Sequence, residues 1–395
     1  MSGQIHKMVL YSHDSLGLGH VRRNLAIAHH MAQHLPGYTG RKLTGLMLSG
    51  VATNDMFRLP SGFHRPVLPG VCKTNDGYRA RHMFGDTQAL LGLRSNLLEA
   101  ALISFAPDLV VVDRHVFGVQ GELRVPLQRL RSEHPGAKVV LGLREVLDDP
   151  RVMSGEWQGL GDIKAVRECI DEIWVYGDRT VHDPVLTGEV PQELSDMVRF
   201  TGYLSYGREL AEHGIDVETT PYVLTTVGGG ADGARLLETA VGVQPPAGHR
   251  HLVVTGPQFD HAAHTAIAAA APPDTRVAAI CRGMSARIRN ASAVMSMGGY
   301  NTTCEILATG TPALLVPRER PRREQLIRAQ ALHRAGIVDL TRSDELSTAG
   351  LERWLSEAVR RRVDRSSVNR DGLDGVVRLA AWLLDTPSRK AGAGR

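Results

Sequence analysis

The sequence predicts an α/β protein made of two Rossmann-like, doubly wound domains that face a central cleft. Two glycine-rich segments support this fold class, because each follows an apolar run that indicates the first strand of a half. Residues 15–20 follow the predicted strand Lys7–Tyr11, and residues 228–233 follow the predicted strand Tyr222–Thr226. Short apolar runs also alternate with helical patterns through both halves, which is typical of parallel sheets covered by helices.

The same alternation gives the individual elements. Apolar runs bounded by turn residues indicate buried parallel strands, and the segments between them have the period of helices. In the first half, helices are predicted over residues 21–33 and 88–105, and strands over 8–11, 43–48, 109–112, 139–141 and 173–176. In the second half, strands are predicted over 222–226, 252–255, 277–279, 293–296 and 313–316, followed by a last helical pattern over 350–384.

The domain boundary is predicted where this pattern stops, after residues 199–205 and before a polar segment. The expected organisation is an N-terminal domain over residues 1–205, a C-terminal domain over 206–385 and a tail over 386–395. Because the tail consists of small and polar residues, we expect it to be disordered. A chain of 395 residues that is 43% hydrophobic can bury two cores of ordinary domain size.

Composition excludes several classes of protein. The net charge of +4 is mildly basic and only 5% of residues are aromatic, so we expect no nucleic-acid partner. No apolar run approaches the roughly twenty residues of a membrane span, so any membrane contact is expected to be peripheral, at the inner face. The four cysteines lack the spacing of a metal or redox motif, and we expect a cytoplasmic location.

The glycine-rich segments are suited to binding an anion. Glycine lets the main chain approach a ligand closely, and the N-terminus of the following helix offers unpaired amides. Either loop by itself could equally be a sharp turn without a ligand. Two such loops at equivalent places favour a ligand between the halves; their candidate binding residues are Gly17, Gly19, Gly228, Gly229 and Gly230.

The most specific stretch lies between residues 293 and 325. A predicted strand leads into Met297-Gly-Gly-Tyr-Asn-Thr-Thr-Cys-Glu305, and after a second strand the chain continues as Pro317-Arg-Glu-Arg-Pro-Arg-Arg-Glu-Gln325. This order of motifs resembles the C-terminal donor-binding region of glycosyltransferase family 28. That family contains the peptidoglycan N-acetylglucosaminyltransferase and has the two-domain GT-B fold. Residues 17–20 are similar to its N-terminal glycine-rich loop, which ends in histidine.

The resemblance implies a nucleotide-sugar donor, with a UDP-linked N-acetylhexosamine as the expected compound. Glu305 matches the family's glutamate that accepts the two ribose hydroxyls, a role suited to a carboxylate because it only accepts hydrogen bonds. Glu324 and Gln325 match the pair that contacts hydroxyls of the donor sugar. The other donor-binding residues expected from the resemblance are Gly298, Gly299, Asn301 and Thr302 near the diphosphate, and Cys281 and Met284 at the base.

Some residues leave alternatives open, and some depart from the family pattern. The segment Thr302-Thr-Cys-Glu305 is also a capping box, in which Glu305 would bond to the start of its own helix. Glu324 is also favourable at a helix N-terminus in its own right. The loop over 228–233 is one residue longer than the family's and lacks its hydroxyl side chain, and Ile280 replaces an aromatic residue at the expected base site.

Catalysis is predicted to involve His20 and Asp113. An inverting transfer needs a base to deprotonate the acceptor hydroxyl, and imidazole is suited to this near neutral pH. A related group of inverting GT-B enzymes pairs a histidine after the first loop with an aspartate, and Asp113 ends a predicted strand where ligand sites gather. Alternatively, His20 bonds a turn carbonyl and Asp113 caps a helix. The sequence contains no Asp-x-Asp motif, so we expect no metal and no cofactor beyond the nucleotide sugar.

The predicted function is therefore inverting, metal-independent transfer of a sugar to an acceptor hydroxyl. The acceptor is expected to be a natural product or a cell-envelope compound bound against the N-terminal domain. Two other classes stay open. A nucleotide-sugar hydrolase or 2-epimerase would use the same donor site with water or the sugar itself as second reactant, and a non-catalytic subunit would bind the donor without turnover.

Overall fold

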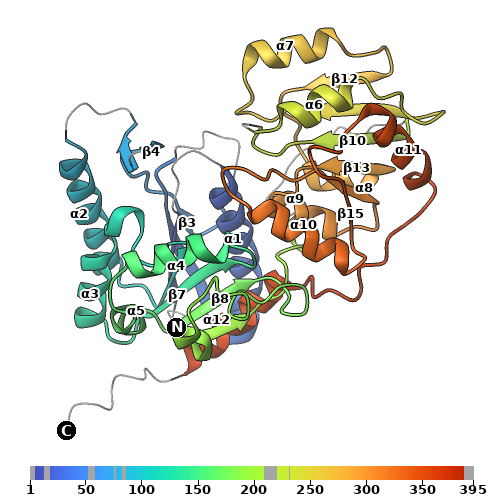
Figure 1. The fold of residues 1–395 in the computed structure, drawn as a ribbon. Helices are drawn as coiled ribbons and strands as arrows, with labels where there is room; N and C mark the ends of the chain where they lie inside the picture. Colours follow the sequence, from blue (N-terminus) through green and yellow to red (C-terminus); the bar gives the residue numbers. More distant parts are fainter. Residues whose placement is uncertain are drawn as a thin grey trace.

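The structure is a computed structural model that describes residues 5–12, 18–51, 58–74, 77–81, 86–208, 220–230 and 232–386. It has two lobes, each built around a β-sheet flanked by helices (Figure 1). The predicted α/β class with two Rossmann-like domains is confirmed. Gly17 and the tail after Thr386 lie outside the described residues, as does most of the predicted junction between the domains.

The N-terminal lobe contains a seven-stranded sheet in the order β3-β2-β1-β6-β7-β8-β9, and every strand pair in it is parallel. Strands β6 and β8 are buried at every residue, which is why they are continuous apolar runs in the sequence. The strands are β1 (Ile5–Tyr11), β2 (Lys42–Leu48), β3 (Phe63–His64), β6 (Leu109–Asp113), β7 (Lys138–Arg144), β8 (Glu172–Tyr176) and β9 (Val198–Phe200). The helices of this part are α1 (Leu18–Thr39), α2 (Thr87–Phe105), α3 (Arg124–Glu133), α4 (Pro150–Gly159) and α5 (Ile163–Cys169).

A small antiparallel hairpin of β4 (Val71–Thr74) and β5 (Gly77–Ala80) is inserted before α2 in the N-terminal lobe.

The C-terminal lobe contains a six-stranded parallel sheet in the order β12-β11-β10-β13-β14-β15. Its strands are β10 (Tyr222–Thr226), β11 (Arg250–Val254), β12 (Thr275–Ala278), β13 (Ala293–Ser296), β14 (Ala313–Leu315) and β15 (Asp339–Leu340). Its helices are α6 (Ala234–Val241), α7 (His261–Ala269), α8 (Met284–Asn290), α9 (Tyr300–Leu307), α10 (Glu324–Arg334) and α11 (Thr348–Ala358).

Both sheets have a topological switch point. In each sheet the first strand lies inside, because the chain builds outward on one side and then returns to build on the other. The switch lies between β1 and β6 in the N-terminal lobe and between β10 and β13 in the C-terminal lobe. The loops at the carboxyl ends of the two strands diverge there, and α/β proteins bind ligands in the resulting crevice.

The last helical pattern of the sequence forms two separate helices, α11 and α12 (Gly372–Asp385). Helix α12 returns to the N-terminal lobe and packs along α1 (Figure 1), where His30 Nε2 lies 2.6 Å from Asp374 Oδ1. The predicted assignment of residues 206–385 to one C-terminal domain is therefore wrong for this helix. Periodicity shows that α12 has an apolar face, but it does not show which lobe that face covers.

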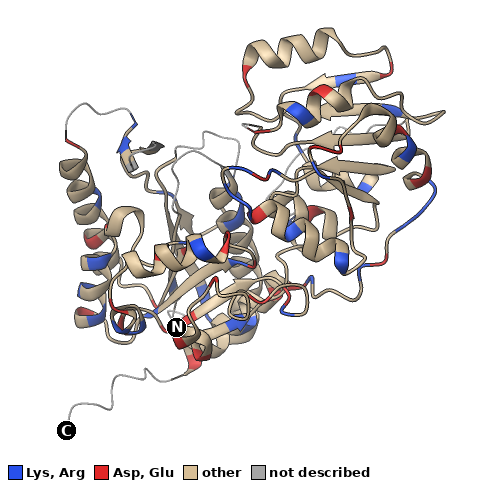
Figure 2. Cartoon of the chain, in the orientation of Figure 1, with Lys and Arg blue, Asp and Glu red and all other residues tan. Residues whose placement is uncertain are grey.

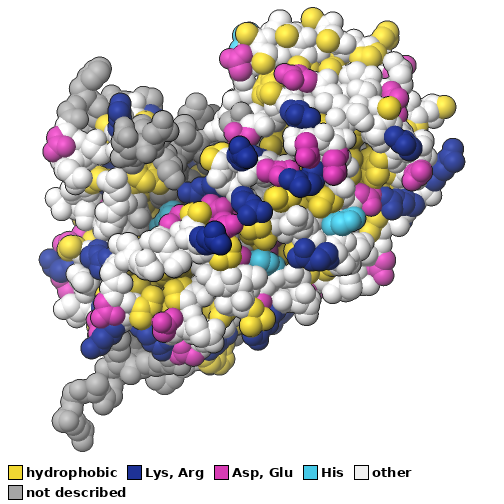
Figure 3. Space-filling model, viewed as in Figure 1, with side chains coloured by type: hydrophobic (Ala, Val, Ile, Leu, Met, Phe, Trp, Pro, Cys, Tyr) yellow, Lys and Arg dark blue, Asp and Glu magenta, His cyan; other side chains and the backbone are white. Residues whose placement is uncertain are grey.

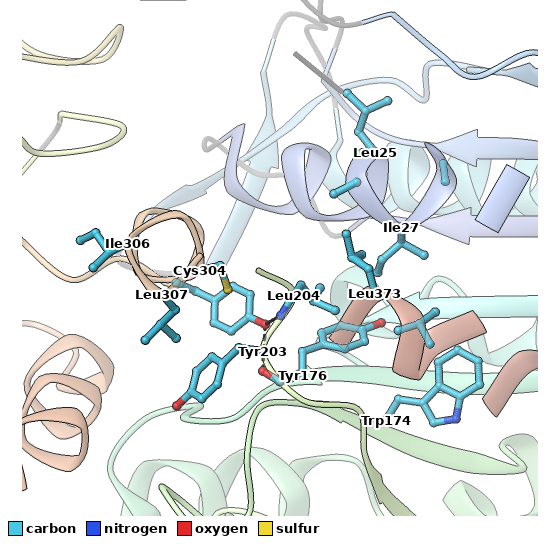
Figure 4. Close-up of a cluster of buried hydrophobic side chains, with 14 of the residues drawn as sticks. Leu25, Ile27, Trp174, Tyr176, Tyr203, Leu204, Cys304, Ile306, Leu307 and Leu373 are labelled. Atoms are coloured by element: carbon cyan, nitrogen blue, oxygen red, sulfur yellow. Dashed lines mark hydrogen bonds between the residues drawn. The ribbon is translucent and has the colours of Figure 1, made fainter. Parts of the chain in front are cut away.

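A continuous buried core joins the lobes. Its cluster of apolar side chains includes residues from both sheets and from α12 (Figure 4). Tyr300 of α9 belongs to this cluster, and its hydroxyl donates to the carbonyl of Tyr176 at 2.8 Å and accepts from the amide of Leu204 at 3.4 Å. Figure 4 shows Tyr203 and Leu204 between the side chains of α9 and those of β8. The core holds the start of α9 against the carboxyl end of the N-terminal sheet.

Candidate active site

A cavity of about 270 Å³ lies between the lobes, where the two switch points face each other. From the N-terminal lobe it is lined by Gly19, His20, Arg22, Arg23 and Arg144. From the C-terminal lobe it is lined by Val227, Gly228, Gly229, Pro257, Gln258, Ser296, Met297, Gly299, Tyr300, Asn301, Thr302 and Gln325. Eight of the residues predicted from the sequence are among these: Gly19, His20, Gly228, Gly229, Gly299, Asn301, Thr302 and Gln325.

His20 and Asp113 are in contact. His20 lies in the first turn of α1 and Asp113 at the end of β6, and the two strands before them are neighbours in the sheet. His20 Nδ1 is 2.8 Å from Asp113 Oδ2, and Arg23 one turn further along α1 donates to both carboxylate oxygens at 2.5 and 2.6 Å. His20 is partly exposed, whereas Asp113 is buried.

The surroundings of Asp113 keep it ionised. Burial alone would raise the pKa of its carboxyl, but the charges of Arg23 and His20 and their hydrogen bonds lower it well below its ordinary value. Nδ1 of His20 lies within hydrogen-bond distance of Asp113 Oδ2, at 2.8 Å, and of Arg23 Nη2, at 2.9 Å, and these two contacts fix the orientation of the ring. Proton exchange with a substrate would then use Nε2, which is the arrangement of a general base with an orienting acid.

On the opposite wall, α9 begins at the cavity. Its N-cap is Gly299, which forms no side-chain capping bond, and the residues of its first turn line the space. The unpaired amides of a first helical turn favour a negatively charged ligand. Asn301 joins the two walls, because its Nδ2 donates to the carbonyl of Gly19 at 2.8 Å while its Oδ1 accepts from Arg208 at 3.0 Å.

Glu305 does not line this cavity. It is buried on α9, and its Oε1 accepts from Arg22 Nη2 of the N-terminal lobe at 2.5 Å. Its Oε2 is buried and has no hydrogen-bond partner among the described residues. The capping-box alternative is wrong, because α9 begins at Tyr300, before Thr302, and its N-cap has no side-chain bond.

Of the predicted sugar-contact pair, Gln325 lines the cavity and Glu324 does not. Oε1 of Gln325 accepts from the amide of Arg318 at 3.0 Å. Glu324 is buried beside it and accepts from the Arg318 guanidinium at 2.5 Å, so it is engaged within the loop that precedes α10. Arg323 of this loop reaches Asp149 of the N-terminal lobe at 3.0 Å. The arginines here make ion pairs with acids, and charges of both signs are interspersed in this view (Figures 2 and 3).

Other predicted donor residues lie away from the cavity wall: Gly230, Gly298, Cys281 and Met284 do not line it, and Gly17 is not described. Packing explains why residue 230 is glycine. Its φ is +101°, and a Cβ there would lie 2.4 Å from the carbonyl oxygen of Thr255. The third glycine of this loop therefore meets a requirement of the backbone.

The arginines of the N-terminal wall, Arg22, Arg23 and Arg144, were not among the site residues predicted from the sequence. Arg22 and Arg23 follow His20 on a helix, where charged residues are usually solvated, and no local pattern marks them as different. Arg144 is the last residue of the buried strand β7. A charged residue at the carboxyl end of a buried strand was the feature that marked Asp113, but the strand predicted over 139–141 ends three residues before Arg144, so the same feature did not mark it.

No group of three or more His, Cys, Asp or Glu side chains is placed to hold a metal ion within the described ranges. Among the helices described, none is long and apolar enough to span a membrane.

Comparisons with known proteins agree with this architecture. Residues 224–371 match the glycosyltransferase family 28 C-terminal domain. A search of curated proteins finds no match. The chain is similar in fold to the glycosyltransferase SnogD from Streptomyces nogalater, with a TM-score of 0.61, 16% identity, and 95% of this chain and 100% of that chain covered.

Two further solved structures have the same fold. Acinetobacter baumannii MurG has a TM-score of 0.55 at 15% identity, over 95% of this chain and 99% of that chain. Phytolacca americana UGT2, solved with UDP-2-fluoro-glucose and pterostilbene, has a TM-score of 0.59 at 12% identity, over 96% of this chain and 99% of that chain. At these identities the likeness establishes the fold.

Proposed function

We propose that this chain, a glycosyltransferase of the GT-B type with a family 28 C-terminal domain, is an inverting enzyme that works without a metal ion. Its donor would be a UDP-linked sugar, with an N-acetylhexosamine as the expected sugar. Its acceptor would offer a hydroxyl group and belong to a natural product or to the cell envelope.

The observation that carries this proposal is the position of the His20–Asp113 pair. It lies at the switch point of one lobe and faces, across a cavity of about 270 Å³, the glycine loop and the α9 N-terminus of the other. In the proposed reaction, His20 Nε2 takes the proton from the acceptor hydroxyl, whose oxygen attacks the anomeric carbon of the donor. The bond from that carbon to the diphosphate breaks, and its electron pair leaves with the diphosphate.

Amides of the glycine loop and of the first turn of α9 would stabilise the leaving diphosphate. Gly228 and Gly229 line the cavity opposite His20, and both come directly after strand β10. Preorganised amides can stabilise developing negative charge without a cation. The choice of UDP is supported by the family resemblance and by UGT2, whose structure contains a UDP-sugar. A cell-envelope acceptor is supported by the resemblance to family 28, which contains the peptidoglycan N-acetylglucosaminyltransferase.

Calorimetry with a panel of nucleoside diphosphates tests the donor. We expect UDP to bind, and clear binding of another nucleotide without UDP would contradict the proposed base. Turnover is then followed with the matching nucleotide sugars in the presence of a chelator. Activity that is lost on chelation and returns with magnesium or manganese would contradict the metal-independent step. Release of free sugar or an epimer without any acceptor would instead indicate the hydrolase or 2-epimerase.

A further inference from the structure

Arg144 is placed to meet a substrate. It ends β7, the strand beside β6, and Asp113 of β6 is in register with Gly142 of β7. Arg144 therefore lies two positions further along the neighbouring strand, at the same edge of the sheet as the His20–Asp113 pair. It also lines the cavity between the lobes. Its guanidinium stands on the N-terminal wall of the same space as Gln325, near the start of α10.

The neighbouring arginines each have an acidic partner. Arg22 is paired with Glu305 at 2.5 Å and Arg23 with Asp113 at 2.5 Å. Arg328 is paired with Glu145 at 2.7 Å.

Arg144 differs from all three. Within the part of the chain that the structure describes, its side chain forms no ion pair and no hydrogen bond, and its Nε is buried without a hydrogen-bond partner. Burial first, and then the positive charge of Arg328, lower the pKa of Arg144 to about 10, while the negative charge of Glu324 acts in the opposite direction. The guanidinium is nevertheless charged near neutral pH.

A cation without an ion pair at a partly buried position is unfavourable in the empty protein. A ligand that carries a negative charge would compensate such a group. Groups with perturbed pKa values in clefts cluster at functional sites for this kind of reason. We infer that Arg144 binds a negatively charged oxygen group of the substrate, a phosphate or a carboxylate, between His20 and the start of α10. This inference rests on the proposed function in that the ligand is taken to be a nucleotide sugar.

Two parts of a donor carry that chemistry. One is the diphosphate, and the other is a carboxylate on the transferred sugar, as in a uronic acid. The planar guanidinium suits both, because it donates two parallel hydrogen bonds to either group. The glycine loop and the α9 turn already offer amides to a diphosphate, whereas Arg144 adds a full positive charge on the opposite wall.

The test compares the wild type with Arg144→Gln and Arg144→Lys, and uses Arg151→Gln, a change at an exposed position on α4, as the matched control. Calorimetry is run with inorganic pyrophosphate, with the nucleoside diphosphate that the wild type binds, and with its glucose and glucuronate sugars. Loss of a charged hydrogen bond should weaken binding about 10- to 100-fold in Arg144→Gln. Arg144→Lys should retain part of the affinity, and Arg151→Gln all of it.

The pattern of losses identifies the anion. Weaker binding of pyrophosphate and of the nucleotide assigns Arg144 to the diphosphate. Weaker binding confined to the glucuronate sugar assigns it to a carboxylate. Unchanged affinity for all four probes in Arg144→Gln overturns the inference while leaving the proposed function intact. If the wild type binds no nucleotide, the proposed function fails, and the pyrophosphate arm still tests the anion site.

Thermal stability without ligand gives a second readout. Because Arg144→Gln removes a charge that has no ion pair among the described residues, the variant should melt at the same temperature as the wild type or higher. A clearly lower melting temperature would mean that Arg144 stabilises the fold without ligand, and it would contradict the inference that Arg144 serves only to bind the ligand.

Discussion

Arg328 and Glu145 form a buried ion pair that joins the two lobes. Nε of Arg328, on α10, donates to Oε1 of Glu145, just after β7, at 2.7 Å, and neither side chain is exposed. Burial alone would lower the pKa of Arg328, but the negative charge of Glu145 holds it above its ordinary value. Nη1 of Arg328 also donates to the carbonyl of Gly298 at 3.3 Å. The pair thus links the interface between the lobes to the loop that begins α9.

Breaking this pair should be strongly destabilising. Glu145→Leu or Arg328→Met leaves one buried charge uncompensated, and we expect a loss of about 3–5 kcal/mol in the free energy of unfolding. The double variant Glu145→Leu, Arg328→Met removes both charges and should recover most of that loss. Urea unfolding measures all three. As a control, Arg167→Met breaks the exposed pair with Asp196 and should change stability by less than about 1 kcal/mol. Losses that simply add in the double variant would contradict the pairing.

Removal of the proposed base should reduce turnover and spare donor binding. We expect His20→Ala to lower kcat by about 10²–10⁴-fold, since general base catalysis is lost. Asp113→Asn should also lower kcat, because the imidazolium loses the carboxylate that stabilises it. The two losses should not add if the residues act as one unit. Full activity of His20→Ala would remove this residue from the chemistry.

Arg22 and Glu305 give opposite expectations for nucleotide binding. If Glu305 accepts the ribose hydroxyls, Glu305→Ala should weaken binding by about 1.5–3 kcal/mol, as for a lost charged hydrogen bond. Arg22 occupies Oε1 of that carboxylate in the structure, so a nucleotide that uses both carboxylate oxygens displaces it. The cavity of about 270 Å³ is also at the lower end of the size of ligand pockets, which fits a site that has to open.

Arg22→Met should therefore strengthen nucleotide binding while lowering the stability of the empty protein, because Glu305 is left buried and unpaired. Calorimetry and thermal unfolding with and without nucleotide measure both effects. Weaker binding in Arg22→Met would mean that Arg22 itself contacts the ligand. Glu305→Ala with normal affinity and lowered stability would show that Glu305 serves only the interface.

Acid should destabilise the C-terminal lobe through His251. This side chain is buried on β11, with Nε2 2.8 Å from Thr225 Oγ1, and burial lowers its pKa to about 4 from an ordinary value of 6.5. Below pH 6.5 His251 is protonated in the unfolded chain but stays neutral in the folded chain, so stability falls as the pH decreases towards 4. The full effect is about 3 kcal/mol.

Unfolding free energies of the wild type and His251→Gln between pH 4 and 8 test this expectation. The wild type should lose more stability on acidification than the variant does. His6 and His30, whose pKa values are also lowered, are present in both proteins, so their contributions cancel in the comparison. Parallel pH profiles would contradict the assignment to His251.

The sequence by itself determined the repeating βα arrangement and the two glycine-containing loops. Inner parallel strands are buried on both faces, so their sequences are continuous apolar runs such as Leu109–Val112. Such a run can be recognised without knowing which strands lie beside it. Short edge strands such as β3 and β15, and the β4–β5 hairpin, were missed because they bury little and carry no such run. The positions of His20 and Asp113 followed from the rule that ligand sites gather at the carboxyl ends of strands, while their pairing came from the family resemblance.

Tertiary structure alone decided which groups meet across the lobes. The return of α12 to α1 and the pairing of Arg22 with Glu305 join residues far apart in the chain, and the lack of an ion-pair partner for Arg144 among the described residues also follows from how the lobes pack. Periodicity indicates that a helix has an apolar face, and a charged residue type indicates a polar side chain. Neither indicates which element or residue the face or the side chain will contact. Partners are fixed only when the lobes pack, because ion pairing and desolvation act over a few ångströms of space and are insensitive to separation along the sequence.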